Sequence, residues 1–277
     1  QPRTITENEL TTTLGSFNYG RITGDFNVQT GQDAALRINA MVTKADNNGS
    51  GSNIDKKGLA AAYRFGIGTA DEFSVGLYAL DNNNGMNYGL PWIKPTAASP
   101  TADTTINDKL DPSAYFGMAS DYNAGTAKYI TASHLHRFDA DTELKTTIRK
   151  GSYTRDQRAG AVRFCRSSTN ATTGVVTNPQ CPITTPALDT FGPNTIFTRG
   201  NHAKIQDLDS LYGQSDFSHK LNAWGFKHEI LAGIDYARES KNVFAASGVT
   251  KPTILAGNPD DGASINEGAR TVRRTSA

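Results

Sequence analysis

Residues 20–43 read GRITGDFNVQTGQDAALRINAMVT and contain two segments of alternating polarity on either side of a short turn. In the first segment every second residue is apolar or small, namely Ile22, Gly24, Phe26 and Val28. The residues between them are polar, namely Arg21, Thr23, Asp25 and Asn27. Because successive side chains of a β-strand point to opposite faces, this pattern predicts a strand with one apolar and one polar face. The second segment repeats the pattern after the turn at 30–33, so the stretch predicts an antiparallel pair.

The same alternation recurs along the chain and predicts an all-β protein of antiparallel, up-and-down strands. We expect about nine strands, at roughly 4–14, 17–29, 34–45, 57–67, 72–88, 124–138, 142–156, 207–221 and 227–242. Residues 243–277 are expected to form another long loop, because their polar end at 273–277 carries no strand signal.

The connections between these strands alternate strictly between two lengths. Short turns fall at 30–33, 68–71, 139–141 and 222–225. Long polar connections lie near 46–57, 81–122 and 157–205. An up-and-down sheet puts every second connection at the same rim, and outer-membrane barrels have short turns at one rim and long loops at the other. The chain is therefore expected to form part of a transmembrane β-barrel.

Composition agrees with a β-rich protein and argues against some classes of partner. The chain has 277 residues, of which 28 are basic and 27 acidic, so its formal net charge of +1 argues against nucleic-acid binding by bulk charge. Ten Tyr, twelve Phe and two Trp favour strands and argue against disorder. No apolar run reaches the roughly 18 residues that a membrane helix needs, whereas a barrel strand needs only about 9–11.

Periodicity alone leaves two interpretations of the polar face open: the exterior of a soluble sandwich or the wet lumen of a barrel. This face carries charge at Arg21, Asp25, Arg37, Arg64, Lys145, Arg149, Asp216 and Asp235. The apolar face has few large residues and tolerates Gly, Ala and Thr, which suits contact with lipid better than close packing. Aromatic residues lie near the expected strand ends, as in a membrane-interface girdle, at Phe65, Phe138, Phe217, Trp224, Phe226 and Tyr236. Both features favour the barrel.

The two cysteines, Cys165 and Cys181, lie in one loop rich in Gly, Thr and Pro. A disulfide between them would close a loop of about 17 residues, contribute about 3 kcal/mol in the chain-entropy model, and imply an oxidising compartment. Free thiols or metal ligands are the alternatives, but no His or Cys stands at zinc spacing around them. We therefore expect the disulfide.

Several segments together resemble the TonB-dependent siderophore receptors. They are an early-strand motif at 34–41, a Tyr-Gly-Leu-Pro turn at 88–91, a pre-strand segment at 111–117, a His-x-Phe to Thr-x-Leu turn at 136–144, and paired strands ending in Gly-x-Asp-Tyr at 207–236. Their order and spacing run from about residue 9 to 240. Within the family, residues 111–165 are most similar to receptors for ferric catecholate siderophores.

The resemblance implies a large, 22-stranded type of barrel with a plugged lumen in the outer membrane of a Gram-negative bacterium. It implies a monomeric, non-enzymatic importer that binds ferric siderophore, contacts outer-membrane lipid, and is energised by the TonB–ExbB–ExbD complex through the plug domain. No cofactor is expected, because iron enters only within the ligand. Residues 1–277 are expected to be a barrel fragment of about nine strands that lacks the family's plug domain and about thirteen further strands. The opening Gln1-Pro2-Arg3, without Met or a signal-peptide pattern, also suggests a processed or excised piece.

An anionic, aromatic ligand of this kind needs cations and aromatic faces at the outer rim. The candidate ligand-binding residues are Tyr88, Trp92, Tyr115, Tyr122, Tyr153, Arg155, Arg158 and Arg163. The alternative for any one of them is a solvated loop residue or a girdle residue. We expect no catalytic residues.

His134 and His136 lie two residues apart on one strand face, a spacing that can hold a metal ion. No third ligand is near in the sequence, and the family resemblance places the pair near the periplasmic girdle. We therefore expect girdle residues and no metal site.

Three functions follow from these observations. Import of ferric siderophore is favoured by the resemblance and by the loop asymmetry. A passive outer-membrane porin is the nearest alternative, and a soluble β-sandwich module for binding or adhesion is the more distant one. A plug domain upstream of Gln1 would distinguish the receptor from the porin.

Overall fold

The computed structural model describes residues 1–46, 51–184, 186–246 and 248–276. The described residues form ten long strands: Glu7–Gly15 (β1), Tyr19–Gln29 (β2), Ala35–Ala45 (β3), Ile54–Phe65 (β4), Asp71–Asn84 (β5), Tyr122–Arg137 (β6), Thr142–Phe164 (β7), Ile196–Ala223 (β10), Phe226–Ala246 (β11) and Arg270–Ser276 (β13). Three two-residue strands lie in the connections: Ser168–Thr169 (β8), Val176–Thr177 (β9) and Ile254–Leu255 (β12). No helix among the described residues is long and apolar enough to cross a membrane.

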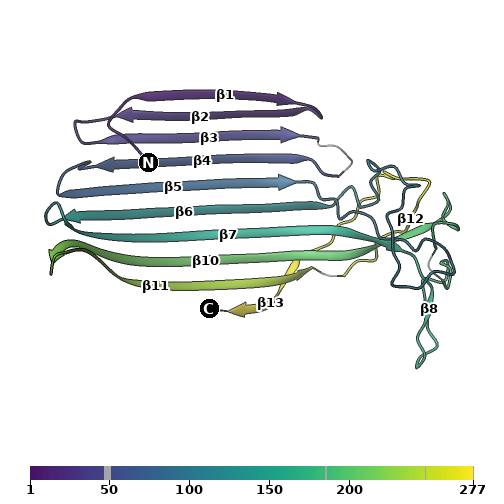
Figure 1. The fold of residues 1–277 in the computed structure, drawn as a ribbon. Helices are drawn as coiled ribbons and strands as arrows, with labels where there is room; N and C mark the ends of the chain where they lie inside the picture. Colours follow the sequence, from purple (N-terminus) through teal and green to yellow (C-terminus); the bar gives the residue numbers. More distant parts are fainter. Residues whose placement is uncertain (47–50, 185, 247, 277) are drawn as a thin grey trace.

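The long strands form one antiparallel sheet in chain order, β1-β2-β3-β4-β5-β6-β7-β10-β11-β13, while β12 pairs with β10 (Figure 1). β8 and β9 form a separate small hairpin. The sheet is open, since β1 and β13 occupy its two ends. The short turns after β2, β4, β6 and β10 lie together at one end of the strands, and the long connections lie at the other (Figure 1). The turn between β1, which ends at Gly15, and β2, which begins at Tyr19, is also short but lies at the end of the long connections, so the predicted strict alternation of lengths is wrong at this position. The predicted all-β, up-and-down fold is thus confirmed.

The nine predicted strands all form, but two of the predictions about loops are wrong. β7 continues to Phe164 and β10 starts at Ile196, so much of the expected loop at 157–205 is strand. Residues 270–276, expected to lie in a loop, form β13 against β11, with Ala246 opposite Arg270 and Lys241 opposite Ser276. Pairing with a neighbouring strand satisfies backbone donors and acceptors whatever the side chains are, so a strand of polar residues gives no hydropathy signal.

One face of the sheet is apolar and remains exposed. In neighbouring strands Phe26 is opposite Ile38, Ile38 opposite Ala61, and Leu77 opposite both Ala61 and Ile130. Leu77 is 56% exposed and Ile234 on β11 is 75% exposed. A sandwich would bury such side chains between its sheets, whereas a lipid-facing barrel wall leaves them outside.

The opposite face is polar and cross-linked by ion pairs. On it Arg37 contacts Asp25 at 2.5 Å, and Arg64 forms an ion pair with Glu72. Arg137 also reaches Glu72, at 3.3 Å. We call these two surfaces the apolar face and the polar face.

The hydrophobic core of the molecule lies in the long connections rather than on the sheet. It contains Ile93, Phe116, Phe191, Phe197 and Ile254, which come from three connections and the start of β10. The rings of Phe116 and Phe197 meet edge to face at 5.1 Å between centroids. These connections therefore pack together at one end of the sheet (Figure 1). We call them the loop cluster, which comprises residues 85–121, 165–184, 186–195 and 248–269.

Candidate functional site

Buried charges tie the loop cluster to the ends of β7 and β10. The Asp121 carboxylate accepts hydrogen bonds from the backbone N–H of Gly160 at 2.7 Å and of Met118 at 3.0 Å. Lys251, whose side chain is fully buried, lies 2.7 Å from Glu267 and 3.7 Å from Asp121. Arg199 of β10, also fully buried, forms an ion pair with Asp261. The cluster is thus a packed unit built on the strand ends.

Tyr115, a candidate ligand-binding residue, lies inside this unit and is 6% exposed. Its hydroxyl contacts the carbonyl oxygens of Met86 and Met118 and the carboxylate of Asp121, all at 3.0–3.1 Å. Burial, together with the Asp121 carboxylate, raises the pKa of the Tyr115 hydroxyl, so it stays protonated. A Cβ added at Gly51 would lie 2.4 Å from the Tyr115 ring. Tyr115 is therefore a buried side chain that stabilises the packing of the loops.

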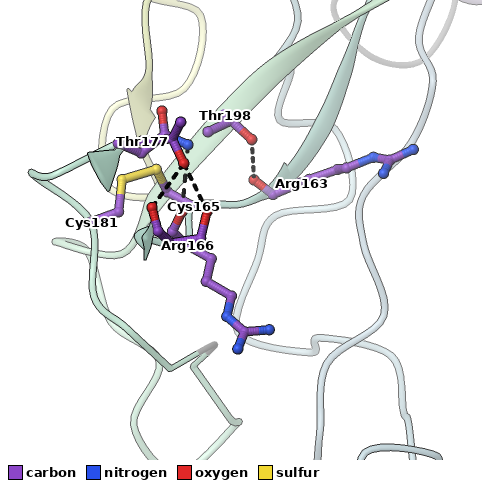
Figure 2. The surroundings of a disulfide bond; sticks show 8 residues. Arg163, Cys165, Arg166, Thr177, Cys181 and Thr198 are labelled. Atoms are coloured by element: carbon purple, nitrogen blue, oxygen red, sulfur yellow. Dashed lines mark hydrogen bonds between the residues drawn. A yellow bond between two sulfur atoms is a disulfide. The ribbon is translucent and has the colours of Figure 1, made fainter. Parts of the chain in front are cut away.

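Cys165 and Cys181 form a disulfide, with Cα atoms 5.6 Å apart (Figure 2). Both cysteines are buried, and the Cys165 N–H donates to the Ile196 carbonyl at 2.9 Å. Between the cysteines, β8 and β9 form a hairpin in which the Ser168 and Thr177 hydroxyls are 2.7 Å apart. The disulfide thus closes the base of a hairpin that projects from the cluster, at 166–180 (Figure 1).

The cationic candidates on β7 do not form one surface. Alternate residues of β7 point to the same face, so Tyr153, Arg155 and Arg163 lie on the polar face with Arg149. Figure 2 shows the Arg163 side chain extending away from the disulfide. Arg158 lies on the other face of β7, opposite Tyr122 of β6. Its guanidinium carbon is 6.0 Å from the centroid of the Tyr122 ring.

The remaining aromatic candidates lie around the loop cluster. The Tyr88 ring packs against His202 of β10 at 4.3 Å between centroids, and its hydroxyl hydrogen-bonds the His202 Nε2. Trp92 is 64% exposed and precedes the buried Ile93. The structure thus brings Tyr122 together with Arg158 and leaves Trp92 at the surface.

The structure also brings together a group of which the sequence singled out only Tyr153 and Arg155 as candidates. Tyr78 of β5 stacks on Tyr129 of β6 at 4.7 Å, and the Arg149 guanidinium lies over the Tyr129 ring at 4.7 Å. The Arg149 Nε donates to the Thr131 hydroxyl at 2.9 Å, and Tyr212 is opposite Arg149 on β10. Only the strand register reveals this group. We call Tyr78, Tyr129, Arg149, Tyr153, Arg155 and Tyr212 the tyrosine–arginine band.

The band continues into a pocket on the polar face of the first five strands. The lining of this pocket includes Tyr78, Ala60, Asn39, Asp25 and Arg21. Aromatic faces, amides and guanidinium groups therefore line one continuous surface on the side of the sheet opposite the apolar face. Such a surface can hold an anionic aromatic molecule through stacking and charge-assisted hydrogen bonds.

Comparison with known proteins identifies relatives along nearly the whole chain. No protein-family model matches it. The catecholate siderophore receptor Fiu of Escherichia coli O157:H7 is 26% identical over 278 aligned residues, which cover 98% of this chain and 34% of the receptor. The chain is homologous to the catecholate siderophore receptors. It spans about a third of the length of the curated relatives it matches, since the Fiu of strain K12, 25% identical, is also covered to 34%.

Solved structures of siderophore receptors share the fold. The open form of the ferric-catecholate import receptor Fiu from E. coli K12 superposes with a TM-score of 0.79 at 22% identity, over 98% of this chain and 40% of that chain. The siderophore receptor PiuA from Acinetobacter baumannii gives a TM-score of 0.67 at 15% identity, over 91% of this chain and 33% of that chain. The predicted resemblance and the predicted fold, part of a large receptor barrel, are confirmed.

Proposed function

We propose that this chain is part of the wall of an outer-membrane receptor that imports a ferric catecholate siderophore with energy from the TonB system. The observation that carries the proposal is the homology to Fiu over 98% of the chain. The exposed apolar face supports a place in lipid, and the grouping of the long connections at one end supports an elaborated outer rim. The disulfide supports a compartment outside the cytoplasm.

In this function the polar face lines the lumen and the tyrosine–arginine band contacts the ligand or its path. Ferric catecholate complexes are anionic and rich in aromatic rings, so guanidinium groups and tyrosine rings suit them. Trp92 and Arg163, exposed in or beside the loop cluster, are candidates for first contact. The protein then acts as a monomeric transporter and not as an enzyme, with iron as cargo. A plug domain outside residues 1–277 would provide the connection to TonB.

Uptake of radioactive iron tests the proposal. A Gram-negative strain deleted for its own catecholate receptors would express the intact gene that encodes this chain. We expect uptake from a ferric catecholate complex that disappears when tonB is deleted. Uptake that survives deletion of tonB and extends to unrelated small solutes would favour a porin. Absence of uptake in a strain that inserts the protein into its outer membrane would refute the importer.

A further inference from the structure

A carboxylate and two imidazoles meet at the short-turn end of β5 and β6. The Asp71 Oδ1 accepts hydrogen bonds from the His134 Nε2 at 2.8 Å and from the His136 Nδ1 at 2.7 Å. Asp71 is opposite His136 in the strand register, and Phe73 is opposite His134. Because alternate residues of a strand share a face, the three polar side chains lie on the apolar face with Phe73. This cluster lies on the opposite side of the sheet from the tyrosine–arginine band.

The cluster offers the donor set of a transition-metal site. One ligand atom from each of Asp71, His134 and His136 lies within 4.8 Å of the others. Zinc binds imidazole nitrogen and carboxylate oxygen at about 2.0–2.2 Å, so small side-chain rotations suffice to bring all three atoms to one ion. All three side chains are between one-third and one-half exposed. Asp71 is the first residue of β5 and His136 is next to the last residue of β6, so the group lies at the rim of the sheet, where water can fill a fourth position.

The two imidazole rings are already oriented by aromatic neighbours. The His134 ring stacks on Phe73 at 4.3 Å between centroids and 5° between planes. The His136 ring meets Phe138 edge to face at 4.5 Å. Phe65 stacks on the far side of the group, 5.1 Å from Phe73. Rings held on paired strands by such contacts lose little further freedom when they bind a metal.

We propose that Asp71, His134 and His136 bind a divalent transition metal, with Zn²⁺ as the preferred ion. Two neutral imidazoles and a carboxylate suit zinc better than the harder Mg²⁺ or Ca²⁺, which take oxygen ligands. The ion would join β5 to β6 beside the turn at 138–141. The expectation from sequence was no metal site, because the third ligand comes from a different strand, 63 residues before His134.

Isothermal titration with ZnCl₂ tests the site on the protein purified in detergent after removal of metal with a chelator. We expect one bound Zn²⁺ per chain from this site, and His134→Gln, His136→Gln and Asp71→Asn should each weaken its affinity by about tenfold or more. Titration with Co²⁺ should give the visible absorption of a nitrogen- and oxygen-ligated ion, which each variant removes.

His219→Gln is the matched control. His219 lies on β10 near the same short-turn rim, and its Nδ1 contacts the Thr142 hydroxyl at 2.8 Å. This variant should bind Zn²⁺ as the unaltered protein does. The protein used is the product of the intact gene that encodes this chain, and its heat-dependent gel mobility verifies that every variant is folded. Absence of Zn²⁺ binding at millimolar concentration, or equal binding by all four folded variants, would overturn the proposal.

Discussion

At the scale of single residues, the buried aromatic side chains of the loop cluster stabilise its packing, whereas the exposed ones do not. Tyr115 is enclosed and its hydroxyl has three partners, whereas Trp92 is largely exposed. We expect Tyr115→Phe to destabilise the loop cluster by about 1–3 kcal/mol, because it leaves buried acceptors unsatisfied. Amide hydrogen exchange in residues 85–121 should accelerate. Trp92→Ala should leave this exchange unchanged, and equal acceleration in both variants would contradict the assignment.

Arg149 is the residue whose replacement best tests the tyrosine–arginine band. Its guanidinium lies on Tyr129 and Thr131 of the neighbouring strand. Loss of a charge-assisted hydrogen bond to an anionic ligand costs about 1.5–3 kcal/mol, so Arg149→Gln should weaken ferric catecholate binding roughly tenfold or more. Lys145→Gln is the control, because Lys145 shares the polar face but lies near the short-turn end of β7, opposite Leu135 and Asp216 and away from the band. Equal affinities of the two variants in fluorescence-quenching titrations would remove the band from the ligand path.

At the scale of strands, the alternation of polar and apolar residues predicted the positions of strands that have one apolar face. The alternation of Ile22, Phe26 and Val28 with polar residues was sufficient to locate β2, and the other eight predicted strands also form. β13 was missed because backbone pairing with β11, not hydropathy, defines it.

The candidate sites depend on register, which the sequence does not display. Tyr78 meets Tyr129 and Asp71 meets His134 across gaps of about 50 to 60 residues, so no local motif records them. Tyr115 was chosen for its aromatic ring in a loop, but only tertiary packing reveals that the ring is enclosed.

The two faces of the sheet predict opposite responses to substitution. Leu77→Arg puts a charge on the exposed apolar face and should cost about 2–4 kcal/mol near the membrane midplane. Lys145→Gln on the polar face, opposite Asp216, should be tolerated. Folding titrations into lipid bilayers measure both, and similar losses for the two variants would contradict the lipid-facing assignment. Arg64 also lies on the polar face, but it is unsuitable as a control because its replacement would leave the buried carboxylate of Glu72 without this ion-pair partner.

The disulfide hairpin is an element whose loss should leave the sheet intact. The double variant Cys165→Ser and Cys181→Ser removes a disulfide that stabilises its loop by about 3 kcal/mol. This loop contributes no long strand to the sheet. We expect faster exchange at 166–180 and weaker binding of ferric catecholate, with unchanged insertion into the membrane. Mass spectrometry of the unreduced protein should find no alkylatable thiol before the substitutions. Unchanged affinity after them would limit the disulfide to a stabilising role.

At the scale of the whole molecule, stability is divided between a hydrogen-bonded sheet and a separately packed loop cluster. The sheet presents apolar residues outward, while Phe116, Phe197 and Ile254 make the core in the loops. Ligand-binding loops must be able to rearrange, and in the proposed receptor a local stability of the loop cluster that is separate from that of the sheet would permit this.

Lys251 is the residue that tests whether the loops behave as one unit. Its ammonium group lies between Glu267 and Asp121, and Asp121 also holds the Met118 and Gly160 backbone. Lys251→Met leaves two carboxylates without their cation, which costs about 3–5 kcal/mol for a buried pair. We expect hydrogen exchange to accelerate together in 85–121, 165–184 and 248–269, while amides in the centre of β5, β6 and β7 stay protected. Acceleration confined to 248–269 would show that the loops open independently, and the cluster would then be three separate loops around a shared apolar contact.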